Sequence, residues 1–406
     1  MATDWKEVES KYYMFCARRQ PIVLVRGEGT RVWDDVGKEY LDFTAGWAVN
    51  NIGHANPVIA DAVAEQARTL LQTSNQFYTI PQLQLAEVLV ENSCLDKVFI
   101  CNSGAEANEG AVKLARKYGK IHRNGAYEVI TAYNSFHGRT LNMVAATGQP
   151  HHQESFQPMP AGFASGGPVH GYVEYGNIDD IKAATTDKTV AVMLEPVQGE
   201  GGVNIPPRDY LKQVRQWCDD NDLLLILDEV QTGLGRLGTL FGYESFDVEP
   251  DVMTLAKGLG GGVPIGAFLA KEHASVLVPG EHGSTFGGNG LTCAAANAST
   301  RHIIENDIPS HARKMGEYLR DGLEGLRASH DFILDVRGMG LLYAVQFSSE
   351  MSAAVVTACN EAGALLNPVK PDAVRLMPPL TVSEAEIDQA VERLDTGFTQ
   401  AAQAII

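Results

Sequence analysis

One lysine stands between an apolar run and a run of glycines in the stretch TLAKGLGGGVPIGA. This residue, Lys257, follows DVMTLA, which has the composition of a buried strand and carries no charge after Asp251. Lysine is almost never fully buried without a partner. An apolar pocket lowers the pKa of a lysine, and the neutral amine that results is a nucleophile. The stretch therefore predicts a lysine that is buried because it takes part in chemistry.

Two acidic residues end another apolar run, in LLLILDEVQ. A buried carboxylate is costly unless it is paired with a cation or hydrogen-bonded. We therefore expect at least one of Asp228 and Glu229 to hold a positively charged partner. Taken alone, the two acids are explained equally well by the ordinary polarity of a strand end.

A potential phosphate seat follows a third run, VFICN. Ser103 and Glu106 have the spacing of a capping box at the start of a helical stretch, with Gly104 and Ala105 between them. A helix N-terminus with small residues exposes free N–H groups and the positive end of the helix dipole, which together attract phosphate. On this motif alone, a plain helix cap is the more ordinary interpretation.

Two further loops carry residues that suit a flat, charged ligand. Phe136, His137 and Arg139 follow YEVITAY, and an aromatic ring can cover a planar group while an arginine can hold a carboxylate. Glu195 and Glu200 follow VAVML, and the glycines beside Glu200 let the backbone approach a ligand. Each residue alone is also explained as an ordinary loop residue. Together with Lys257 and Asp228 they predict a pyridoxal 5′-phosphate site, with a Schiff base on the lysine and the aspartate at the ring nitrogen.

Two other motifs do not fit their usual meaning. GLGRLG, at residues 233–238, matches the dinucleotide-binding fingerprint, but no helix signal follows it, so we reject that interpretation. His151 and His152 have no second ligand at metal spacing. We expect them in a surface loop and predict no metal site.

The elements that must position these residues are short apolar runs separated by helical stretches. The runs are continuous rather than alternating, which is typical of a parallel sheet covered on both faces. They are KVFICN, YEVITAY, VAVMLEP, LLLILDEV, DVMTLAK and GAFLAK. In open α/β sheets, ligands bind beyond the carboxyl ends of the strands, where the candidate residues stand. We therefore predict a large α/β domain over residues 61–295.

The pattern changes from about residue 296. A long helical stretch contains Pro309 as a break, and strand-like ILDVRGMGLLYAVQF, a helix and AVRLMP follow it. SEAE opens the last helix as a capping box. We predict a smaller α+β domain over residues 296–406, joined by a hairpin-rich segment at residues 1–60.

The composition excludes several classes of protein. A net charge of −18 argues against nucleic-acid binding, which needs clustered positive charge. The six cysteines are scattered, which favours reduced thiols over disulfides or zinc. We find no signal peptide at the start and no apolar run of the roughly 20 residues that a membrane span needs. We therefore expect a cytoplasmic location and no membrane or nucleic-acid partner.

The chain resembles the class III aminotransferases, and among them most closely those that act on acetylornithine. The resemblance runs nearly end to end through YLDFTAGWAVNNIGHANP, NSGAEANEGAVKLARKYG, FHGRTLNMVAATGQP, EPVQGEGGV, LDEVQTGLGRLG, DVMTLAKGLGGGVPIGA, HGSTFGGN and AVRLMPPLTVSEAEID. It implies fold type I of the pyridoxal-phosphate enzymes: a large domain with a mostly parallel seven-stranded sheet, a smaller α+β domain, and a homodimer.

The resemblance also implies roles for individual residues. Lys257 would form the Schiff base and carry the proton, and Asp228 would keep the ring nitrogen protonated. Gln231 would bind the ring hydroxyl, and Phe136 would stack on the ring. Thr285 would reach the phosphate of the partner subunit's cofactor. The remaining cofactor contacts would be Ser103, Gly104, Ala105, His137 and Val230.

Substrate binding is implied for a second group of residues. Arg375 would hold the α-carboxylate of glutamate or 2-oxoglutarate, and Glu200 would pair with Arg375 when the donor has no carboxylate there. Arg139 would hold the far carboxylate of acetylornithine, and Ser284 would touch substrate.

One position departs from the related ornithine aminotransferases, which carry a tyrosine just before the AVN segment. Here the matching position is Gly46, followed by Trp47, which we include among the substrate contacts. The change favours an N-acylated donor over free ornithine.

The implied reaction is ping-pong transfer from N-acetylornithine to 2-oxoglutarate in arginine synthesis, giving N-acetylglutamate semialdehyde and glutamate. Another ω-aminotransferase, acting on 4-aminobutyrate, ornithine, succinylornithine or a lysine-pathway amine, remains an alternative. A mutase or decarboxylase of the same fold is disfavoured by the presence of Glu200 with Arg375. The intact Lys257 and Asp228 disfavour a non-catalytic protein.

Overall fold

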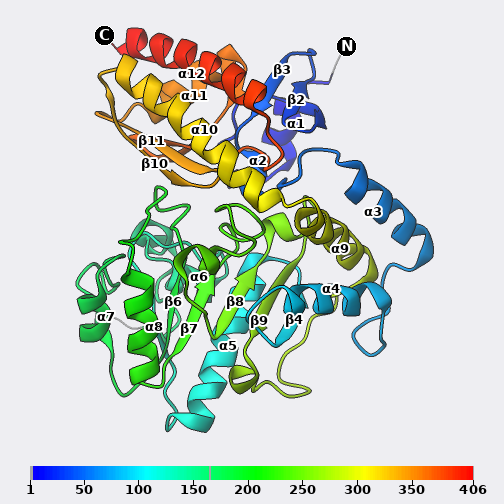
Figure 1. The fold of residues 1–406 in the computed structure, drawn as a ribbon, viewed down its shortest axis with the longest axis vertical. Helices are drawn as coiled ribbons and strands as arrows, with labels where there is room; N and C mark the ends of the chain where they lie inside the picture. Colours follow the sequence, from blue (N-terminus) through cyan, green and yellow to red (C-terminus); the bar gives the residue numbers. More distant parts are fainter. Residues whose placement is uncertain (1–2, 164–165, 406) are drawn as a thin grey trace.

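The computed structural model describes residues 3–163 and 166–405, which form three sheets and their covering helices (Figure 1). The largest sheet has six strands in the order β4-β9-β8-β7-β6-β5. β9 runs antiparallel to both of its neighbours, and the other adjacent pairs are parallel. The strands are β4 (Lys97–Cys101), β5 (Glu128–Ile130), β6 (Thr189–Leu194), β7 (Leu224–Asp228), β8 (Val252–Leu255) and β9 (Gly266–Ala270).

The strands of this sheet read as continuous apolar runs because both faces are buried. Leu224 and Ile226 of β7 pack in one core cluster with residues of α5 (Gly104–His122). Leu225 and Leu227 belong to the other cluster, together with residues of α8 (Tyr210–Asp220). Successive side chains of a strand point to opposite faces, so both sets must be apolar. The predicted covered sheet is confirmed.

The sheet has six strands rather than the predicted seven. Beyond β5, Phe163 and Val173 each form only an isolated parallel bridge, to Val129 and Ala132. The sequence between them includes Gly166, Gly167 and Pro168. Glycine weakens a strand interior and proline removes a ladder donor, so none of the residues described at this edge forms a strand.

Two four-stranded sheets complete the fold above the central sheet (Figure 1). One is antiparallel and contains β10 (Ile333–Met339), β11 (Leu342–Phe347), β14 (Ala373–Leu376) and β13 (Asn367–Lys370), in that order. The other contains β1 (Leu24–Glu28), β2 (Arg31–Asp34), β3 (Glu39–Asp42) and β12 (Ala364–Leu365). Because β3 pairs with β12, the N-terminal hairpins share a sheet with the C-terminal part of the chain.

The helices of the C-terminal part begin and end where the sequence signals stand. α9 (Gly290–Glu305) and α10 (Ile308–Ser329) are separated near Pro309, which lies in the first turn of α10. The capping box at Ser383 is present, with hydrogen bonds of 2.9 and 3.3 Å between Ser383 and Glu386. The remaining helices there are α11 (Ser352–Ala362) and α12 (Glu384–Ile405).

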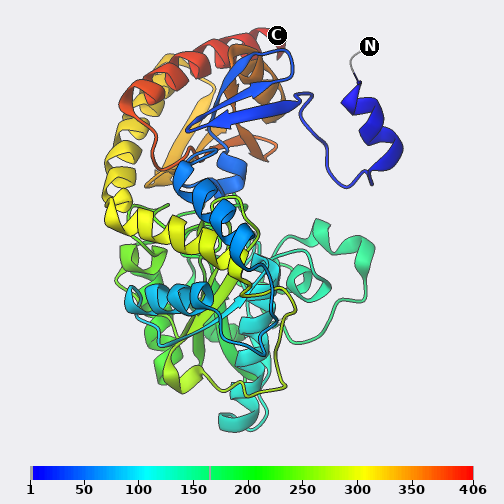
Figure 2. The same cartoon turned by 90° about the vertical axis from the view of Figure 1, so that its right-hand side faces the viewer.

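The other helices lie in the N-terminal part and around the central sheet. They are α1 (Trp5–Tyr12), α2 (Ala45–Ala48), α3 (Pro57–Thr69), α4 (Ile80–Glu91), α6 (Leu141–Ala146) and α7 (Ile178–Ala184). α1 stands away from the rest of the chain (Figure 2) and has no buried residue. The predicted domain boundaries fall inside α3 and α9 and stay a prediction. Among the described residues, no helix combines the length and apolarity needed to cross a membrane.

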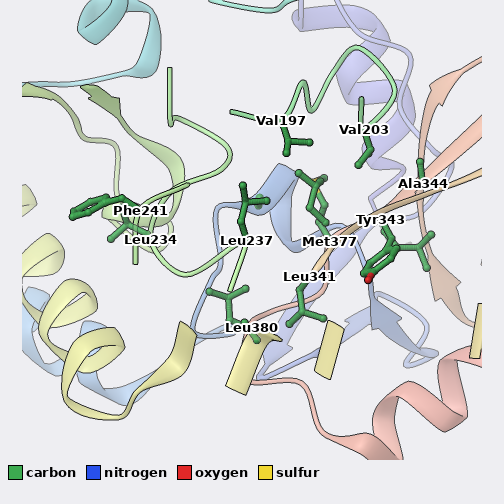
Figure 3. Packing of buried hydrophobic residues seen from close by; sticks show 14 of the residues in the cluster. Val197, Val203, Leu234, Leu237, Phe241, Leu341, Tyr343, Ala344, Met377 and Leu380 are labelled. Carbon is green, nitrogen blue, oxygen red and sulfur yellow. The ribbon is translucent and has the colours of Figure 1, made fainter. Parts of the chain in front are cut away.

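The stretch GLGRLG, rejected as a dinucleotide motif, joins the sheets. Arg236 is fully buried and donates hydrogen bonds to the carbonyls of Leu341 and Pro378 and to the side chain of Asn51. Around it, apolar residues of this stretch lie in one core with residues of the C-terminal part (Figure 3). Burial lowers the pKa of Arg236 to about 9. The stretch therefore contributes to packing between segments.

Candidate active site

A cavity of about 440 Å³ lies beyond the carboxyl ends of β6, β7 and β8 and at the N-terminus of α5. This is the edge of the sheet that the sequence indicates. Most of the predicted site residues line it. They are Ser103, Gly104, Ala105, Phe136, His137, Arg139, Glu200, Asp228, Val230, Gln231 and Lys257.

Lys257 lies two residues after the end of β8, at the start of a short 3-10 turn. Its backbone is left-handed, with φ of +44°, a conformation that costs a non-glycine residue energy. A Cβ on the following Gly258 would lie 2.2 Å from Nδ2 of Asn51, so the chain at this turn requires a glycine. Burial lowers the pKa of Lys257, although the carboxylate of Glu200 opposes that shift. The geometry thus holds a poorly solvated amine at the cavity wall.

Asp228 ends β7 and is held by three hydrogen bonds. Its Oδ2 lies 2.7 Å from Nδ1 of His137 and accepts from Nδ2 of Asn108 at 2.7 Å. Its Oδ1 accepts from the N–H of Val230 at 3.0 Å. Asn108 also donates to the carbonyl of His137, which ties the two partners together. The carboxylate is 3% exposed, and these contacts fix its direction at the cavity.

The N-terminus of α5 forms the predicted cap, with one difference. Oγ of Ser103 accepts from the N–H of Glu106 at 3.2 Å, as in a capping box. The carboxylate of Glu106, however, accepts from the N–H of Asn102, at 2.6 Å. A Cβ on Gly104 would lie 2.9 Å from a methyl group of Val230, so a larger residue there would require Val230 to move. The first turn of the helix therefore presents its backbone to the cavity.

Glu200, Gln231 and Arg375 form a hydrogen-bonded triangle, of which Glu200 and Gln231 line the cavity. Nη1 of Arg375 lies 2.9 Å from Oε1 of Glu200. The Gln231 amide accepts from Arg375 at 3.0 Å and donates to Glu200 at 3.1 Å. Burial raises the pKa of Glu200, but the charges of Arg375 and Lys257 outweigh it and bring that pKa to about 2.

Phe136 and Arg139 lie together at the cavity, with the guanidinium carbon 5.2 Å from the ring centre. The sequence predicts a surface position for His151 and His152, and His151 is exposed, whereas His152 is half-buried. Its ring packs edge-on against Phe136, and Nη1 of Arg139 donates to its Nδ1 at 3.4 Å. Burial and the neighbouring charge of Arg139 lower the pKa of His152 to about 4.

Four predicted substrate or cofactor residues do not line the cavity. Arg375 is connected to it through Glu200 and Gln231. Ser284 is one contact away, since its Oγ accepts from the lining residue Asn102 at 3.0 Å. Thr285 is exposed, and Trp47 is 58% exposed. The roles of all four stay predictions.

The structure gives specific contacts to two buried residues: Asn108, which the sequence analysis did not single out, and Glu195, which it placed in the loop that carries Glu200. Asn108 orients Asp228, and its place one turn after Gly104 on the same helix face is a signal that could have found it. Glu195 accepts from the N–H groups of Phe136 at 3.1 Å and Gly199 at 3.3 Å. Burial, and then the charge of Asp228, raises the pKa of Glu195 well above its ordinary value. Glu195 thereby joins the two loops that flank the cavity.

Comparisons with known proteins agree with this architecture. Residues 14–397 match the family described as aminotransferase class-III. The chain is similar to an acetylornithine aminotransferase of Caldanaerobacter subterraneus subsp. tengcongensis, with 49% identity over 95% of this chain and 97% of that one.

Two solved structures are also similar. One is the ornithine aminotransferase of Toxoplasma gondii ME49, with a TM-score of 0.93, 33% identity, and 100% and 97% of the two chains covered. The other is the N-acetylornithine aminotransferase of Stenotrophomonas maltophilia K279a, with a TM-score of 0.84, 36% identity, and 98% and 99% covered. These likenesses confirm the predicted fold class.

Proposed function

Because the chain belongs to the class-III aminotransferases, we propose that its cavity transfers the terminal amino group of N-acetylornithine to 2-oxoglutarate. Family membership establishes that the chain is an aminotransferase. The proposal concerns the donor, the cofactor and the residues that act. Similarity to the acetylornithine aminotransferase of C. subterraneus supports this donor.

The residues present fit pyridoxal 5′-phosphate. Gly104 and Ala105 offer helix N–H groups for the phosphate, and Asp228 offers a fixed carboxylate for a ring cation. Phe136 offers an aromatic face, and Lys257 a buried amine for the aldehyde. When bound, this cofactor draws electrons from the carbon that carries the reacting amino group.

Lys257 moves the proton in our proposal. Burial lowers the pKa of its amine, so the group can take a proton from the reacting carbon and return one later. The left-handed turn and the tightly packed Gly258 keep the amine at the cavity wall. Three hydrogen bonds hold the carboxylate of Asp228 in place, so that it can pair with the ring nitrogen of the cofactor.

Two substrates must use the same cavity in turn. Arg375 binds the α-carboxylate of glutamate or 2-oxoglutarate, and Glu200 neutralises Arg375 when the reacting end of the donor has no carboxylate. Arg139 binds the far carboxylate of N-acetylornithine from its place beside Phe136. The observation that carries the proposal is the ion pair between Glu200 and Arg375 at the cavity that contains Lys257.

Visible absorbance of the purified holoenzyme tests this proposal. We expect excess N-acetylornithine without keto acid to remove the cofactor band, and 2-oxoglutarate to restore it. A band that ignores N-acetylornithine but responds to 4-aminobutyrate or lysine would overturn the proposed donor. A band that responds to no amine would overturn the role of the cavity in transamination.

The proposed enzyme acts as a cytoplasmic homodimer in which Thr285 completes the partner's phosphate site. The exposure of Thr285 and its position outside the cavity of its own chain support this arrangement. Mixed dimers, with Thr285→Ala in one chain and Lys257→Ala in the other, test it. We expect weak cofactor retention in the site whose phosphate depends on the altered Thr285. Retention that follows each chain's own Thr285 would overturn the cross-subunit role.

A further inference from the structure

An arginine outside the cavity holds the loop that carries Glu200. Arg337 lies on β10, and its Nε and Nη2 both donate to the carbonyl of Gly202, at 2.9 and 2.7 Å. Its Nη1 donates to Asp335 at 2.9 Å and to Gln346 at 2.7 Å. All three nitrogens are therefore engaged, and the planar guanidinium has a fixed direction.

The ends of this loop are also fixed. Gln198 and Asn204 exchange backbone hydrogen bonds of 3.1 and 3.0 Å, which closes the loop at its base. Val197 and Val203 are fully buried in the same core cluster as residues of the C-terminal sheet, including Tyr343 (Figure 3). The segment left to be positioned is the short turn that contains Glu200 and Gly202.

The two arginines that reach this loop lie in one row of the C-terminal sheet. Ala344 of β11 pairs directly with Arg337 of β10 on one side and with Arg375 of β14 on the other. Residues paired directly across antiparallel strands have side chains on the same face. Arg375 binds the side chain of Glu200, and Arg337 binds the backbone of Gly202.

We propose that Arg337 is a positioning residue, which fixes the loop backbone so that Glu200 meets Arg375. On this basis an incoming carboxylate displaces Glu200 through rotation of its side chain, while the loop backbone stays in place. The inference rests on the proposed function, because it concerns the exchange of partners at Arg375. If Arg337 has this role, the C-terminal sheet controls which substrate Arg375 accepts.

We expect the loss of Arg337 to affect the two half-reactions unequally. A poorly positioned Glu200 neutralises Arg375 less well, which penalises a donor whose reacting end has no carboxylate. The same loss makes Arg375 easier to reach for the α-carboxylate of glutamate. A residue with only a structural role would lower both half-reactions together.

The test measures the two half-reactions separately in the holoenzyme with Arg337→Met, which keeps the aliphatic stem but cannot donate. We expect kcat/KM for N-acetylornithine to fall about tenfold, and kcat/KM for glutamate to stay equal or rise. Arg393→Met is the matched control, because Arg393 also donates to a backbone carbonyl, that of Gly363 at 2.8 Å. The control should not change the ratio of the two values.

Hydrogen exchange provides a readout that does not depend on activity. In Arg337→Met, amides of the peptide 197–205 should exchange at least about tenfold faster, while the central sheet keeps its protection. Arg337→Lys retains one donor and should restore part of both effects. Unchanged exchange in this peptide, or an equal loss in both half-reactions, would overturn the inference.

Glu200→Gln separates this inference from the proposed function. If Glu200→Gln changes the ratio of the half-reactions and Arg337→Met does not, the positioning role is wrong and the exchange at Arg375 stands. If Glu200→Gln leaves the ratio unchanged, the proposed exchange itself is wrong.

Discussion

Asp228 and Glu200, two of the carboxylates that line the cavity, have different surroundings. Asp228 is held by Asn108, His137 and the N–H of Val230, which all belong to the central sheet or to segments packed on it. Glu200 pairs with Arg375, which comes from the C-terminal sheet. One carboxylate is fixed within a single part of the fold, and the other is held across two parts.

The two carboxylates suit different partners: one a charge that is always present, and the other a charge that is replaced during the reaction. The hydrogen bonds to Asp228 are short and mutually supporting, so this site can stabilise a charge that is present throughout the reaction. The partner of Glu200 is an arginine, which binds any carboxylate in the same way. An incoming substrate can therefore replace Glu200, whereas nothing in the proposed cycle replaces Asp228.

Removing the amine of Lys257 should have the largest effect, because the proposed reaction of either substrate needs it. We expect Lys257→Ala to lower kcat by at least about 1,000-fold, because both the nucleophile and the proton carrier are lost. Single-turnover kinetics of each half-reaction measure this. Near-normal turnover in the variant would contradict the whole assignment.

Asp228→Ala removes the carboxylate that is fixed within a single part of the fold. We expect at least about a 100-fold loss, of equal size in both half-reactions, because the ring charge is needed with either substrate. Cofactor content should be measured alongside the rates, since the protein should still bind the cofactor. A loss confined to one half-reaction would show that Asp228 is not the permanent partner.

Glu200→Gln removes the carboxylate that a substrate can replace at Arg375. Its effect should be smaller, and it should differ between the two half-reactions. We expect kcat/KM for N-acetylornithine to fall about tenfold while the value for glutamate is kept or raised, because Arg375 then lacks its competing anion. Steady-state kinetics with each donor check this. Equal losses with both donors would remove the distinction between the two carboxylates.

The smallest expected effect is a pH-dependent difference in the free energy of unfolding between the native chain and Glu200→Gln. The pKa of Glu200 is depressed from 4.5 to about 2 in the folded chain, so its stabilisation is present above pH 4.5 and is lost as the pH falls towards 2. Urea denaturation should find the native chain more stable than Glu200→Gln at pH 7. The difference should shrink between pH 4.5 and 2, and a constant difference would contradict the depressed pKa.

The part of the site around Asp228 and Lys257 could largely be predicted from the sequence. Asp228 and Lys257 directly follow apolar runs, and parallel strands bring their carboxyl ends to one edge of a sheet. Ser103 and Gly104 carry the local signal of a helix start. These residues are placed by short-range patterns, so the sequence by itself determined which edge of the sheet forms the cavity.

The contact between Glu200 and Arg375 was decided by tertiary structure. The resemblance suggested Glu200 and Arg375 as partners, but their contact depends on how the C-terminal sheet packs over the loop. The shared row of Arg337 and Arg375 depends on strand register, and a shift of one residue would turn a side chain to the opposite face. The packing of His152 against Phe136 likewise depends on a tertiary contact. Local spacing specifies the chemistry of the end of a strand, whereas only the folded chain decides which distant cation reaches it.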